Sequence, residues 1–185
     1  MRRLLTASLL AGLAMFAWGF LFWTVLMPGP RAFSSADDSA ALSEALVTYL
    51  PETGTYALPV WEGTEKQMEE KFATGPVATI FFHRDGVTAM SPLTFLFGYL
   101  QMTLACLVAA LLLHMTASAL PSYGSRVAAV FLLGLAGTLF LELAQPIWWH
   151  HPWRFHLLYS LYACVSWLLA GTVLGAMIKK GRLRF

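Results

Sequence analysis

Four long runs of this sequence contain almost no charged side chains, and they constrain the fold more than any other feature. The runs are Leu4–Met27, Leu93–Met115, Val127–Trp149 and Phe155–Ile178, and Glu142 is the only acidic residue inside them. Each run reaches the roughly 20 residues that an α-helix needs to cross about 30 Å of hydrocarbon. We therefore predict an α-helical membrane protein with four transmembrane helices.

The overall composition agrees with this prediction. Hydrophobic residues make up 58% of the 185 residues and charged residues only 12%, whereas a soluble domain is about half apolar and about a quarter charged. The formal net charge of +2 comes from basic residues placed at the ends of the apolar runs. We expect the lipid bilayer as a partner and no nucleic acid.

The first run is also tested as a secretory signal, because Arg2 and Arg3 give it a basic start. Its apolar stretch is longer than the central region of a signal peptide, and Trp23–Met27 offers no small residues for cleavage. Ser34–Ala36 has small residues but lies well beyond the apolar run. We predict an uncleaved membrane anchor at residues 1–27.

Charged residues outside the runs predict the orientation in the membrane. Residues 28–92 hold nine acidic and four basic residues, whereas the link Thr116–Arg126 holds one basic residue and no acidic one. Further basic residues precede the first run and follow the fourth, at positions 2, 3, 179, 180, 182 and 184. The positive-inside rule then places both termini in the cytoplasm and residues 28–92 outside.

Alternating helix and strand signals within residues 28–92 predict a compact extracytoplasmic α/β domain. Pro28-Gly-Pro30 should end the first helix, and the apolar spacing within Ser39–Tyr49 predicts a short helix. Gly54–Pro59 reads as a strand. Thr64-Glu-Lys-Gln67 has the sequence of a capping box, so a second helix should begin there and end at Gly75-Pro76.

The strongest strand signal is Val77–Phe82, which is rich in β-branched and aromatic residues. Asp85-Gly86 follows as a hairpin turn, and Val87–Met90 would be the return strand. Residues 93–185 then form a three-helix transmembrane region with a basic cytoplasmic C-terminus.

Glu142 is the first candidate functional residue, because a carboxylate within the bilayer is costly unless it is paired, protonated or hydrated. Helical spacing places Gln145 on the same face, and Pro146 leaves the carbonyl of residue 142 without its usual helical donor. From estimated depths we predict a polar cluster of Glu142, Gln145, Tyr159 and Tyr99. The cluster has two interpretations: hydrogen-bonded packing between helices, or a proton-accepting or ligand-binding pocket open to the outside.

The link between the third and fourth runs is rich in aromatic and imidazole rings. Its tryptophans suit the membrane interface. His150, His151 and His156 are candidate metal ligands, because neutral imidazole binds metals well. Adjacent histidines point apart, however, and no cysteine or carboxylate follows at a metal-site spacing. We expect interfacial histidines, with a metal or redox site as the alternative, and no cofactor.

Small residues and cysteines suggest helix packing. Gly171-Thr-Val-Leu-Gly175 has the small-xxx-small spacing that lets helices approach closely, either within one chain or between copies in a homo-oligomer. Cys106 and Cys164 fall inside the runs and are expected to be free and apolar in character. The sequence has no phosphate-binding glycine loop, no GxSxG and no HExxH motif.

Two short motifs carry a resemblance. Tyr56-Ala-Leu-Pro59 and Gly75-Pro-Val-Ala-Thr-Ile80, followed by an apolar helix, are similar to a pattern in bacterial inner-membrane proteins of comparable size and uncharacterised function. The resemblance covers about residues 50–115 and implies a bacterial plasma membrane, but no activity.

From all of these features we expect a non-enzymatic accessory or interaction subunit of a membrane complex. A small oligomeric transport or proton-relay protein centred on Glu142 is the alternative, and an outer-face metal site is a further one.

Overall fold

A computed structural model describes residues 1–27 and 33–179 of the chain. The described residues include four helical segments that are long and apolar enough to cross a membrane. They are α1 (Arg2–Phe20) continued by η1 (Leu21–Leu26), α5 (Pro92–Met115), α6 (Tyr123–Glu142) continued by α7 (Ala144–Trp148), and α8 (Trp153–Met177). The predicted stop at Pro28-Gly-Pro30 and the basic residues after Lys179 lie outside the described residues.

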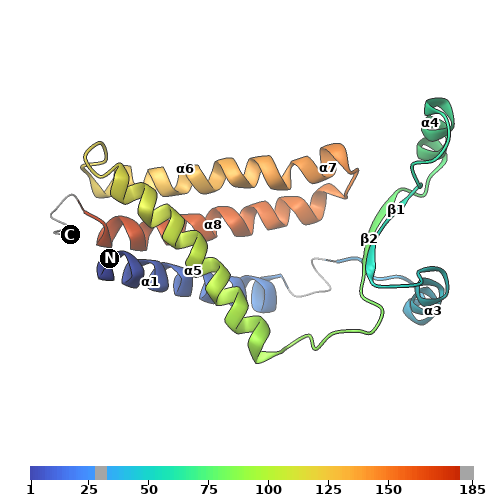
Figure 1. The fold of residues 1–185 in the computed structure, drawn as a ribbon, viewed down its shortest axis with the longest axis horizontal. Coiled ribbons are helices and arrows are strands. Elements are labelled where there is room, and N and C mark those ends of the chain that lie inside the picture. Colours follow the sequence, from blue (N-terminus) through green and yellow to red (C-terminus); the bar gives the residue numbers. More distant parts are fainter. Residues whose placement is uncertain (28–32, 180–185) are drawn as a thin grey trace.

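The four segments run lengthwise beside one another, with α5 crossing the others obliquely (Figure 1). Helix α1 packs against α5 and α8, and α8 packs against α6. The core between them is made of small and aliphatic side chains, including Ala7, Ala11, Cys106, Ala109, Ala110, Leu113, Val130, Ala170 and Leu174. Cys106 is free and buried, as expected, while Cys164 is half-buried.

Glycines allow the closest helix contacts. A side chain at Gly12 would lie 2.9 Å from the Cα of Thr103, so α1 and α5 meet almost backbone to backbone. Gly171 and Gly175 are buried, and both face Val127 of α6. The small-xxx-small motif therefore packs against α6 within the chain, and its use in a homo-oligomer stays a prediction.

Arg126 has a structural role that its place in the sequence did not reveal. Its side chain is 4% exposed. Its Nε donates to the carbonyl of Gly175 at 2.9 Å, and its Nη1 donates to the carbonyls of Leu120 at 3.2 Å and Pro121 at 2.9 Å. The guanidinium thus joins the C-terminal end of α8, where the helix dipole also favours a positive charge, to the link that precedes α6.

The segment between η1 and α5 contains α3 (Ser39–Tyr49), β1 (Gly54–Leu58), α4 (Glu65–Thr74) and β2 (Ala78–Phe82). The capping box predicted at Thr64 and Gln67 is present, and it begins α4. Strands β1 and β2 pair antiparallel, with Gly54 opposite Phe82. The predicted return strand Val87–Met90 is wrong: β2 already pairs with β1 across the α4 connection, and Val87–Met90 does not belong to a strand.

The prediction of a compact domain is also wrong. The two strands form a narrow ribbon with α3 at one end and α4 at the other, extended across the end of the bundle (Figure 1). Among the described residues of this segment only Met68 is buried, because two five-residue strands are too narrow to cover two helices. Arg84 Nη1 ties the ribbon to α3 by donating to the carbonyls of Val47 and Leu50. We call this segment, residues 33–91, the arm.

Candidate functional site

Glu142 is the last residue of α6, at a break in the third membrane segment. The segment resumes as α7 at Ala144, and the break falls where Pro146 cannot donate a backbone hydrogen bond to residue 142. The carboxylate is 21% exposed and its Oε2 lies 3.1 Å from Nδ1 of His156. The sequence predicted a partner for Glu142, but it did not identify His156 as that partner.

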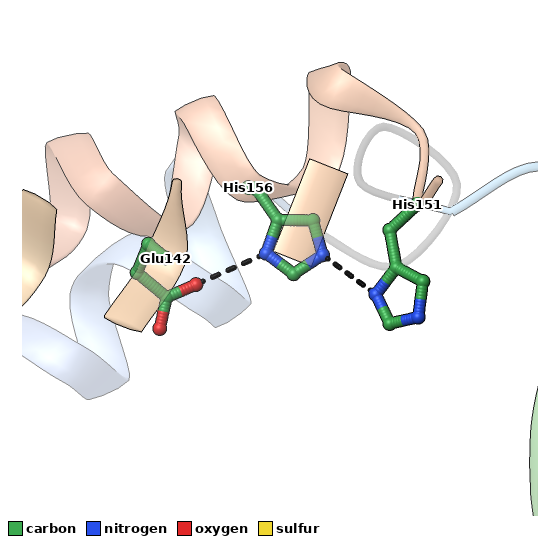
Figure 2. A network of polar contacts seen from close by, with 3 residues as sticks. All are labelled: Glu142, His151 and His156. Atoms are coloured by element: carbon green, nitrogen blue, oxygen red, sulfur yellow. Dashed lines mark hydrogen bonds and ion pairs between the residues drawn. The ribbon is translucent and has the colours of Figure 1, made fainter. Parts of the chain in front are cut away.

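His156 lies in the first turn of α8 and joins Glu142 to His151. Its other ring nitrogen, Nε2, lies 3.2 Å from Nδ1 of His151. The two imidazole rings are stacked with centroids 5.3 Å apart. Figure 2 shows the resulting row of three side chains, which we call the relay: Glu142, His156 and His151.

The chemistry of the three groups sets the direction of their hydrogen bonds. An ionised carboxylate can only accept, so Nδ1 of His156 donates to Glu142. In a neutral ring the Nε2 of His156 then accepts, so Nδ1 of His151 donates to it. This leaves Nε2 of His151 as an acceptor, and this atom is buried with no hydrogen-bond partner among the described residues. Burial lowers the pKa of His151, and the nearby His156 lowers it further, so the ring favours the neutral form.

The relay lies along a cleft of about 780 Å³ between the outer end of the bundle and the arm. One wall comes from β2, and the other comes from α6, α7 and the start of α8. The lining is divided evenly between apolar or aromatic residues and polar ones, and most of the polar residues lie on the bundle side: Phe33, Ser34, Val77, Ala78, Thr79, Phe81, Glu142, Gln145, Trp149, His150, His151, Pro152, Arg154, Phe155, His156 and Tyr159.

A second cavity of about 350 Å³ lies within the membrane-spanning part. It is a groove bounded by α5, α6 and α8, with one residue from α1. Glu142 and Tyr159 line both this groove and the outer cleft. The two cavities therefore share these two lining residues.

The structure brings together three of the four residues in the predicted polar cluster. Gln145 and Tyr159 line the outer cleft with Glu142. Tyr99 lies elsewhere, because its hydroxyl donates to the carbonyl of Leu9 at 3.2 Å, on the side where α5 packs against α1. Estimated depth alone could not show which helices are neighbours.

The three candidate metal ligands do not converge. His150 has a positive φ of 57°, and its ring packs against Phe72 of the arm with centroids 5.9 Å apart. His151 and His156 contact each other. Within residues 1–27 and 33–179 no group of three or more histidine, cysteine or acidic side chains is placed to hold a metal ion.

Comparison with protein-family models, with curated proteins and with solved structures finds no match to this chain.

Proposed function

We propose that this protein is a multi-pass membrane protein that takes up a proton at its outer-face cleft, with the relay as the proton-accepting element. The observation that carries the proposal is the row of two hydrogen bonds, 3.1 Å and 3.2 Å long, from the carboxylate to a buried imidazole nitrogen with no described partner. The proposed role is non-enzymatic.

Proton uptake proceeds by two transfers. A proton from the cleft adds to Nε2 of His151, and the proton on Nδ1 of the same ring passes to Nε2 of His156. His156 is then an imidazolium that donates from both nitrogens and is paired with the Glu142 carboxylate. Because the pKa of His151 is lowered by burial, the proton is passed on rather than held there.

The interpretation of the cluster as simple helix packing accounts for less of this geometry. Pairing the carboxylate requires only the contact with His156. The second histidine contributes nothing to that pairing. It instead extends the row to an acceptor nitrogen in a cleft-lining residue.

The test is to read the tautomers by ¹⁵N NMR of histidine-labelled protein in lipid bilayers. We expect Nδ1–H on both His151 and His156 at neutral pH, and Glu142→Leu, which removes the acceptor oxygen, should abolish this pattern while the protein still folds. His151→Gln assigns the signal, and His150→Gln is the matched control because its ring lies outside the relay. A bare Nδ1 on His156 in the wild-type protein would refute the proposal.

The membrane orientation belongs to the same proposal. The distribution of basic residues supports cytoplasmic termini and an arm outside a bacterial plasma membrane. A single cysteine introduced at Glu65, in a background without Cys106 and Cys164, should react with an impermeant thiol reagent added from outside intact cells. If the cysteine reacted only after the cells were opened, the arm would lie in the cytoplasm and the proposed orientation would be wrong.

A second candidate function is the interaction subunit expected from the sequence, and the arm favours it. Trp61 and Phe81 are 75% and 77% exposed on a segment with one described buried side chain, and exposed apolar surface often marks an interface. Affinity purification in mild detergent should recover a specific partner with the wild-type chain and lose it with Trp61→Ser and Phe81→Ser. Recovery of the wild-type chain alone would count against this role.

A further inference from the structure

The groove beneath the relay gives the outer cleft a second compartment inside the membrane. Both cavities are lined by Glu142 and Tyr159, so a molecule could occupy them together. Resting on the proposed proton-accepting role of the relay, we propose that the two cavities bind one single-chain amphiphilic amine. Its apolar chain lies in the groove and its ammonium head lies against Glu142 and His151.

The groove suits an apolar chain because of where it lies and how it is bounded. Its apolar lining includes Met15, Met102, Leu133, Leu141 and Trp167. All of these belong to segments that are long and apolar enough to cross a membrane. Helix α5 crosses the bundle obliquely and has few contacts with α6 (Figure 1), which leaves the groove between them.

Gly137 leaves space in the groove because it has no side chain. It lines the groove on α6, it is exposed, and a side chain built there would have no atom within 4 Å. A larger residue at this position should therefore fill the groove without straining the helix packing.

The polar end of the cleft suits a hydrogen-bond donor with a positive charge. Glu142 supplies carboxylate acceptor oxygens, and the ring of His151 lines the cleft close to it. The aromatic rings of Phe155 and Tyr159 line the same cleft and can stabilise a cation over their faces. Arg154 also lines the cleft, and its positive charge would favour a ligand with a carboxylate head. The experiment must therefore distinguish an ammonium head from a carboxylate head.

The amine and the proton compete in this arrangement. Proton uptake places a positive charge on the relay, beside the position proposed for the ammonium head. Acidification should therefore weaken amine binding, since a ligand and a proton that favour opposite states of one site oppose each other by the same factor.

The experiment measures binding of dodecylamine, dodecanol and dodecanoate to the full chain in lipid nanodiscs. The three probes share one chain and differ only in the head group. We expect dodecylamine to bind at least about tenfold more tightly than dodecanoate. Glu142→Gln should remove this preference. Gly137→Leu should weaken amine binding by about tenfold or more. Gly98→Leu is the matched control, because Gly98 lies on α5, also has no atom within 4 Å of a built side chain, and lines neither cavity.

The outcomes separate this inference from the proposed function. Unchanged amine binding in Gly137→Leu, tighter binding of dodecanoate, or equal binding of all three probes would each overturn the amine proposal. The ¹⁵N tautomer pattern of Gly137→Leu should match that of the wild-type protein, because the substitution does not touch the relay. Loss of the predicted tautomers in the wild-type chain would overturn the proton-accepting role, whatever the probes do.

Discussion

Replacing Gly12 with alanine should separate α1 from α5, because the obstacle at this position is backbone. The new Cβ would lie 2.9 Å from the Cα and 3.0 Å from the backbone nitrogen of Thr103, and no side-chain rotation relieves these contacts. Ordinary van der Waals contact begins at 3.4 Å, so the two helices must move apart by roughly half an ångström. A gap of this size removes about a quarter of the dispersion energy of each remaining contact between α1 and α5.

The cost follows from what lies between these helices. Ala7, Ala11, Met15, Cys106 and Ala109 are buried in the shared core, and overpacking of a well-packed core costs about 1 to 3 kcal/mol. Alanine regains up to about 1 kcal/mol of helix propensity relative to glycine. The net expectation is a loss of about 1 to 2 kcal/mol in the free energy of unfolding.

The control is the same substitution on the partner helix. Gly98 of α5 has no atom within 4 Å of a built Cβ, so Gly98→Ala should leave stability unchanged or raise it by up to about 1 kcal/mol. Reversible unfolding in mixed micelles, followed by circular dichroism, measures both variants. If Gly12→Ala proved as stable as Gly98→Ala, the close approach of α1 and α5 described here would be refuted.

Two further predictions concern Arg126 and His151. Arg126→Gln should lower the free energy of unfolding by about 2 to 4 kcal/mol, because it removes the charged donor to three carbonyls; the same assay should show little change for the exposed Arg3→Gln. The lowered pKa of His151 means that the unfolded chain binds its proton more readily, so the stability that this ring contributes is present above its ordinary value of 6.5 and is lost as the pH falls below it. Melting temperatures should thus drop less steeply on acidification in His151→Gln than in the wild-type protein, and parallel curves would contradict the assignment.

The parts of the fold that depend on local pattern were predictable from the sequence. Hydropathy and length predicted the four long helices, since every residue of such a run contributes to the same signal. The start of α4 was predicted because the capping box is formed by side chains three residues apart, Thr64 and Gln67. In both cases the determinants lie close together in the chain.

The errors came from contacts between distant residues. Val77–Phe82 did contain a strand, but its partner is β1, on the other side of α4, and no local turn signal indicates that pairing. Tyr99 was assigned to the polar cluster by depth, whereas the packing of α5 against α1 takes it to Leu9.

The pairing of Glu142 with His156 had a usable signal that we did not apply. The two residues lie at comparable distances from the short outer link, on neighbouring antiparallel helices, so they should meet at one depth. Interpreting the three histidines as one group, either as interfacial residues or as metal ligands, does not reveal this pairing. The structure divides that group: His150 contacts the arm, and His151 and His156 complete the relay.

Arg126 links membrane insertion to the finished structure. It is the only charged residue in the link Thr116–Arg126, so in the proposed orientation it is the local charge that the positive-inside rule would use to retain this link in the cytoplasm. After assembly the same guanidinium holds the end of α8. Replacing Arg126 with an uncharged residue would therefore remove a topology signal and, at the same time, loosen the helix ends that this side chain joins.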